Sequence, residues 1–204
     1  MKTIISLVLI WIAHNALSQT ISFKTEATIT EAEIRNTLSV YPPNMLRMIK
    51  WIDVTHLEEN VCGLAHWDGI ELSSVHSREV IIETINHEAS SIFLKQPRFG
   101  EVYDSIMQLF YQINGDMQYR KMKASEITEL NAIQSNYFIG DTYAMTSFEN
   151  DYNTICEYLF TNGKEVIANI TSKPNSAINK KVRCVINYYH SFNSKFTSDF
   201  FSKL

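Results

Sequence analysis

The feature that most constrains the fold is the small extent of strand-type sequence. Three short segments rich in β-branched and aromatic residues are confined to residues 51–72, at Trp51–Thr55, Val61–His66 and Ile70–Leu72. Turn-forming residues separate the segments, so we expect each to be a strand of one small sheet. Helical patterns occur before and after this region, which predicts the α+β fold class.

The longest helix expected near the sheet covers Arg78–Gln96. Ser73, Ser74 and Ser77 offer N-caps for it, and Pro97 marks its end. Upstream, Thr30 and Glu33 fit a capping box that begins a helix over Glu31–Val40. Further helices are expected at Asn44–Lys50, Val102–Ile113, Ser125–Gln134, Ser147–Thr161, Lys164–Ser172, Ala177–Ser191 and Ser194–Lys203.

Composition limits the class of protein. The chain has 204 residues, 45% of them hydrophobic and 20% charged, which is enough for one ordinary core. No linker or repeat divides it, so we expect a single domain over residues 19–204. Eighteen Lys and Arg stand against 22 Asp and Glu. A net charge of −4 does not favour binding to phosphates, so no nucleic-acid partner is expected.

The first eighteen residues have the pattern of an export signal. Lys2 precedes the apolar stretch Ile4–Ala13, and Ala16-Leu17-Ser18 supplies a small-x-small cleavage site before Gln19. The stretch is shorter than the ~20 residues that a membrane-spanning helix needs. We therefore expect a secreted or periplasmic protein with no stable membrane span after cleavage. An uncleaved membrane anchor is the alternative interpretation.

Cysteine usage leaves the redox state open. Cys62, Cys156 and Cys184 all lie in apolar surroundings, and an exported chain permits a disulfide. Because three is an odd number, any disulfide leaves one thiol over. Three buried thiols and one disulfide with a spare thiol both fit the sequence.

The helix over residues 78–96 contains the candidate site. His87 and Glu88 are adjacent, as in the His-Glu-x-x-His motif whose imidazoles lie four residues apart on one helix face and bind zinc. The Glu of that motif takes a proton from the metal-bound water. Here the position of the second His is Ser91. On spacing alone, His87 and Glu88 also fit a surface ion pair or a capped His in the core.

Three segments carry a family resemblance. Thr84–Phe93, Gly140–Met145 and Phe148–Thr161 resemble the motif helix, a preceding turn and a later helix of secreted bacterial zinc-binding metallopeptidases of the glutamate-zincin type. The resemblance implies a zincin-like fold, with a small mixed sheet packed on the motif helix and a mostly helical C-terminal part. It also implies a zinc cofactor and a peptide or protein as substrate or ligand.

Carried over by position, the resemblance makes His87 a metal ligand, Glu88 the general base and Glu157 a further ligand. Glu149 and Asp151 on the same predicted helix are alternatives to Glu157, and they equally fit an acidic first turn. His66, His76 and His190 are candidates to replace the missing imidazole.

Because Ser91 stands where the zinc motif has its second His, both catalytic and non-catalytic functions have to be considered. Catalytic zinc usually has three protein ligands, and a neutral hydroxyl replaces imidazole poorly. The first hypothesis is a metallopeptidase-like protein whose activity is in doubt. The second is a non-catalytic exported binding or accessory protein on a zincin scaffold, and the third is an unrelated exported helical domain.

Overall fold

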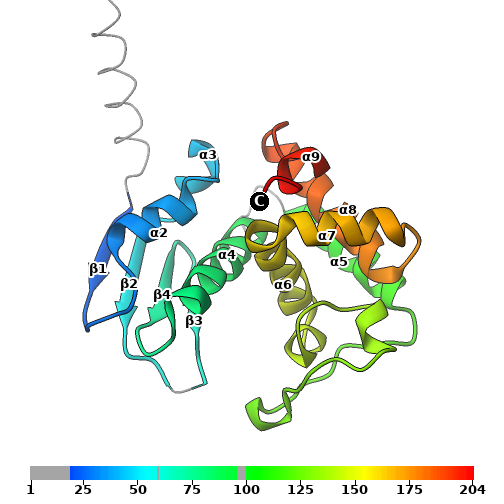
Figure 1. Ribbon diagram of the computed structural model, residues 1–204, viewed down its shortest axis with the longest axis horizontal. Coiled ribbons are helices and arrows are strands. Elements are labelled where there is room, and N and C mark those ends of the chain that lie inside the picture. Colours follow the sequence, from blue (N-terminus) through cyan, green and yellow to red (C-terminus); the bar gives the residue numbers. More distant parts are fainter. Residues whose placement is uncertain (1–18, 59, 96–99) are drawn as a thin grey trace, which may run out of the picture. The chain divides into compact units, whose positions relative to one another are not determined.

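The computed structural model describes residues 19–58, 60–95 and 100–204. The chain forms two compact units, Met1–Phe93 and Leu94–Leu204. The expected signal peptide, residues 1–18, lies outside the described residues, and the single domain over residues 19–204 stays a prediction. Figure 1 shows the sheet in the first unit and the mostly helical second unit. The predicted α+β class and helical C-terminal part are confirmed.

The first unit contains a four-stranded mixed sheet in the order β1-β2-β4-β3. Its strands are β1 (Thr20–Phe23), β2 (Trp51–Thr55), β3 (Gly63–Ala65) and β4 (Gly69–Ser73). β1, β2 and β4 run parallel, whereas β3 pairs with β4 in the antiparallel sense. The three predicted strands are confirmed. β1 was not predicted, because four residues carry too little alternation to stand out from the export signal beside them.

Three helices complete the first unit: α2 (Glu31–Leu38), α3 (Pro43–Leu46) and α4 (Arg78–Leu94). The inward side chains of β2 and β4 have no exposed surface, as expected for alternation along a strand. These side chains are Ile52, Val54, Ile70 and Leu72. The predicted helices are confirmed with shifted ends, and α3 starts at a proline, a residue suited to the first helical turn.

The second unit consists of helices and 3₁₀ turns. The helices are α5 (Gly100–Asn114), α6 (Phe148–Thr161), α7 (Gly163–Ser172), α8 (Ala177–Phe192) and α9 (Ser198–Phe201). The 3₁₀ turns are η2 (Ala124–Glu126), η3 (Gln134–Asn136) and η4 (Thr142–Met145). Within the described ranges, no helix combines the length and apolar character needed to cross a membrane.

The predicted helix over Ser125–Gln134 is wrong. Asn131 Oδ1 accepts hydrogen bonds from the backbone N–H groups of Ile133 and Gln134, both at 3.0 Å. Side-chain bonds of this kind offer the backbone an alternative to the helix. Thr128 exchanges bonds with Thr142 as well, through Thr128 N to Thr142 Oγ1 at 2.8 Å and Thr142 N to Thr128 O at 2.9 Å. The segment is therefore a loop held at both ends.

A buried ion pair lies in the core of the second unit. Lys181 on α8 and Asp151 on α6 are both 0% exposed, and Lys181 Nζ donates to Asp151 Oδ2 at 2.5 Å. Lys181 Nζ also donates to the carbonyl of Tyr137 at 2.8 Å, and Tyr119 Oη donates to Asp151 Oδ2 at 2.7 Å. The pair thus joins two helices to the segment between α5 and α6.

Burial dominates the electrostatics of this pair. It raises the pKa of Asp151 to about 6 and lowers the pKa of Lys181, because a charged group loses its hydration there. Asp151 Oδ1 is buried without a hydrogen-bond partner among the described residues. The pair therefore stabilises the unit only while both partners are present.

We expect Lys181→Met to destabilise the protein by about 3–5 kcal/mol, since it leaves the Asp151 carboxylate buried without its cation. Urea denaturation measures the free energy of unfolding. The double variant with Asp151→Leu is the control. It should lose less stability than Lys181→Met alone, because no buried charge remains. Wild-type stability in Lys181→Met would contradict the assigned role of the pair.

Candidate functional site

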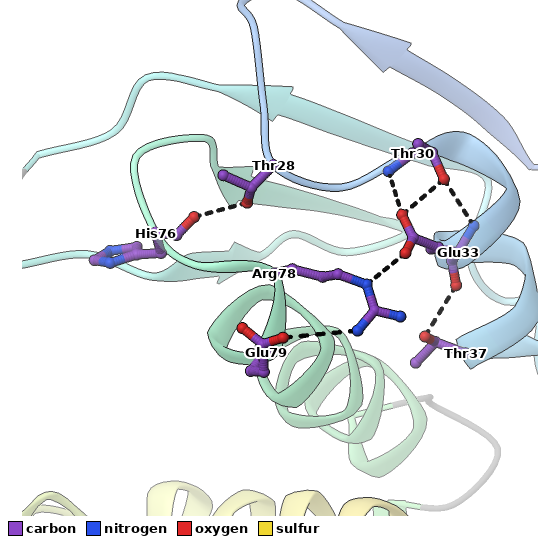
Figure 2. Close-up of polar contacts among 7 residues, drawn as sticks. All are labelled: Thr28, Thr30, Glu33, Thr37, His76, Arg78 and Glu79. Atoms are coloured by element: carbon purple, nitrogen blue, oxygen red, sulfur yellow. Dashed lines mark hydrogen bonds and ion pairs between the residues drawn. The ribbon is translucent and has the colours of Figure 1, made fainter.

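The N-terminus of α4 is tied to α2 by a polar cluster (Figure 2). Glu33 Oε2 accepts from Thr30 N at 2.9 Å and Thr30 Oγ1 at 2.8 Å, and Glu33 N donates to Thr30 Oγ1 at 3.3 Å. The predicted capping box is therefore confirmed. The other carboxylate oxygen of Glu33 accepts from Arg78 Nε, the first residue of α4. Arg78 and Thr30 together lower the pKa of Glu33 from 4.5 to about 2.

The loop before α4 is held in the same way. Thr28 Oγ1 donates to the carbonyl of His76 at 2.9 Å, just ahead of the helix (Figure 2). Ser77, one of the predicted N-caps, accepts from Val80 N at 3.4 Å. Glu79 lies in the first turn, where its negative charge interacts favourably with the positive end of the helix dipole. The predicted C-terminal residues Gln96 and Pro97 lie outside the described residues.

His87 lies in the buried half of α4. Its side chain is 7% exposed, which contradicts the interpretation of His87 as part of a surface ion pair. The neighbouring Asn86 Oδ1 accepts from Tyr41 Oη at 2.9 Å, so polar contacts extend into the core of the unit. Ser91, one turn after His87, is 2% exposed. Glu88 is partly exposed, in contrast to the buried residues on either side of it.

Glu88 lies against strand β3, where Gly63 permits a close approach. A Cβ atom on Gly63 would come within 2.5 Å of Thr84 Cγ2 and 3.1 Å of Glu88 Cγ. Only glycine avoids these contacts without a shift of helix or strand. A glycine inside a strand is a known sign of such an approach, and this signal was available in the sequence. The contact between Gly63 and Glu88 was nevertheless not predicted.

Strand β3 offers backbone groups at the edge of the sheet. Ser73 N donates to Cys62 O, and His66 N donates to Gly69 O, both at 2.8 Å. Hydrogen-bonded and non-bonded pairs alternate along an antiparallel ladder, so Gly63 and Ala65 occupy non-bonded positions. Their N–H and C=O groups therefore point away from β4. Among the described strands, none pairs with this edge.

Glu157, the predicted further ligand, belongs to α6 in the second unit, whereas His87 and Glu88 belong to the first. The alternatives to Glu157 are engaged elsewhere: Glu149 pairs with Lys95, and Asp151 with Lys181. The ligand roles of His87 and Glu157 stay predictions.

The three histidines that are candidates to replace the missing imidazole lie in different surroundings. His66 Nε2 lies 3.6 Å from Glu71 Oε2, and His190 Nδ1 lies 3.2 Å from the carbonyl of Phe196. His76 Nε2 is buried without a hydrogen-bond partner among the described residues. In the described ranges, no three His, Cys, Asp or Glu side chains gather as a group that could hold a metal ion. Within the first unit, the described donors therefore do not supply the three ligands that a catalytic zinc ion usually has.

We expect Gly63→Ala to destabilise the protein by about 1–3 kcal/mol, because the added methyl group forces β3 away from α4. Chemical denaturation checks the stability, and hydrogen exchange of the β3 amides checks the local effect. Gly100→Ala is the matched control, since a Cβ at Gly100 meets no atom within 4 Å. Equal stability of the two variants would disprove the close approach at Gly63.

No protein-family model and no curated protein matches the chain. Among solved structures, the chain is similar to the crystal structure of a "putative zinc-binding metallo-peptidase" from Bacteroides caccae ATCC 43185. The TM-score is 0.60 at 14% sequence identity, over 93% of this chain and 85% of that chain. At this identity the likeness concerns the fold alone. The chain therefore has a metallopeptidase-like fold, as the sequence resemblance implied.

Proposed function

We propose that the protein is an exported polypeptide-binding protein on a metallopeptidase-like fold and does not hydrolyse its ligand. The observation that carries this proposal is the residue one turn after His87 on α4. Residues four apart lie on one helix face, and there Ser91 presents a buried hydroxyl in place of an imidazole. Export through the leader expected over residues 1–18 is part of the proposal, and the mass of the mature chain checks it.

The edge of β3 supports a role in binding a polypeptide. An extended chain can add a strand to an open sheet edge, with main-chain hydrogen bonds providing affinity and alternate side chains providing specificity. The outward N–H and C=O groups of Gly63 and Ala65 supply the main-chain partners. Leu64 between them is 43% exposed and gives an apolar contact on the other face of the strand.

A zinc peptidase is the second candidate function. Its support is the adjacent His87 and Glu88 together with the metallopeptidase-like fold. The donor set argues against it, since His87 and one carboxylate give two ligands and a catalytic zinc ion usually has three.

We expect Ser91→His to raise zinc affinity, because it restores two imidazoles four residues apart on α4. Elemental mass spectrometry of residues 19–204, purified without chelator, measures zinc per chain in the natural and variant proteins. Adding His87→Ala to Ser91→His is the control and should remove the gain. One zinc per chain in the natural sequence, lost on His87→Ala, would favour the peptidase instead.

We expect a short peptide of alternating Thr and Val to slow hydrogen exchange at the Gly63 and Ala65 amides, since a new strand would bond to them. Exchange measured by NMR with and without the peptide tests this. The same peptide with an N-methyl group on every amide has no backbone N–H donor at either edge and serves as the control. Unchanged exchange at both amides, or equal effects of the two peptides, would contradict strand addition.

A further inference from the structure

The second unit contains a pocket of about 210 Å³ that the proposed function does not use. It lies among residues at and after η3, the C-terminal end of α6, α7 and the start of α8. Its apolar lining comes from buried side chains, namely Phe138, Val166, Ile178 and Val182. Pockets for drug-sized ligands span roughly 300–1,000 Å³, so this one suits a smaller group.

One buried side chain lining the pocket has an unused acceptor. Asn179 is 2% exposed, and its Nδ2 donates to Lys173 O at 2.6 Å, Asn169 O at 3.2 Å and Asn169 Oδ1 at 3.3 Å. These contacts occupy the amide donors. Asn179 Oδ1 accepts no hydrogen bond from the described residues. This oxygen is therefore free to accept a hydrogen bond from a ligand in the pocket.

The rim of the pocket presents further acceptors. Glu165 is exposed, and its carboxylate forms no ion pair or hydrogen bond with the described residues. Asn162 Nδ2 donates to Thr161 Oγ1 at 3.2 Å, which leaves Asn162 Oδ1 available. Ser135 Oγ donates its proton to Asn131 O at 2.9 Å, so its lone pairs remain. The pocket therefore combines a carboxylate, neutral acceptors and an apolar floor.

We propose that this pocket binds a primary ammonium group on a short apolar stem. An ammonium group has three donors and no acceptor, which matches Asn179 Oδ1, the Glu165 carboxylate and Asn162 Oδ1. The stem packs on the apolar floor. A free alkylamine and the lysine side chain of a polypeptide share this chemistry. Both are sources of the ligand to be separated by experiment.

Three other positive groups near the pocket, one lysine and two helix N-termini, are each paired or capped. Lys181 Nζ lies 4.2 Å from the ring centroid of Phe138, but its charge is paired with Asp151. The N-termini of α7 and α8 attract anions. Glu165 already lies in the first turn of α7, and Ser176 Oγ caps α8 by accepting from Asn179 N at 3.4 Å.

The experiment titrates residues 19–204 with n-butylamine, 1-butanol and butanoate, followed by NMR shifts of the Asn179 side-chain amide and pocket backbone amides. We expect butylamine alone to shift these signals at matched concentration, and added salt to weaken its binding. Glu165→Gln should lower the affinity about fivefold, since it removes the carboxylate from a partly exposed ion pair. Glu101→Gln is the control, an exposed carboxylate outside the pocket, and should change nothing.

Two lysine compounds identify the source of the ammonium group. The first compound is Nα-acetyl-lysine amide, whose side-chain ammonium group is free. If it binds more tightly than butylamine, the pocket is assigned to a polypeptide lysine. If butylamine binds more tightly, the pocket is assigned to a free amine. The Nε-acetylated compound has no charge and should not bind. Equal binding of butanol, tighter binding of butanoate, or unchanged affinity in Glu165→Gln would each overturn the proposal.

Discussion

The close approach of α4 to β3 is the constraint on which the candidate site depends. Gly63 has no side chain, so Thr84 and Glu88 can lie against the strand backbone. This contact sets the position of Glu88 relative to the sheet edge. The cluster formed by Thr30, Glu33 and Arg78 fixes the N-terminus of the same helix (Figure 2). α4 is thus held at its N-terminus and near its middle, and a peptide at the edge of β3 would meet a rigid support.

In the second unit, a buried ion pair connects the elements of the core. Lys181 and Asp151 hold α8, α6 and the loop before α6 together, and Tyr119 and the carbonyl of Tyr137 satisfy further donors and acceptors. Such a pair adds little net stability over an apolar replacement, but it penalises arrangements that separate its members. It therefore favours one conformation of the segment around Phe138, which lines the pocket of the second unit.

Local patterns predicted the local features of this protein. The capping box at Thr30 and the strand over Trp51–Thr55 depend on neighbouring residues, and both were found from the sequence. Contacts between segments that are distant in the sequence were not predicted. Lys181 on a helix looks like a solvated residue until Asp151 and Tyr137 are brought beside it, and the contact between Gly63 and Glu88 depends on how α4 crosses the sheet.

The presence of His87 and Glu88 does not by itself require catalysis. His87 is buried in the packed half of α4, and the stem of Glu88 lies against β3, so both residues contribute to packing in the first unit. Ser91, in contrast, fits a buried helix position without any metal, because a hydroxyl is small and finds hydrogen-bond partners locally. A metal site binds its ion only when all of its ligands are present, whereas each packed side chain contributes to the stability of the fold by itself. Two motif residues can therefore outlast the third when the fold serves binding rather than hydrolysis.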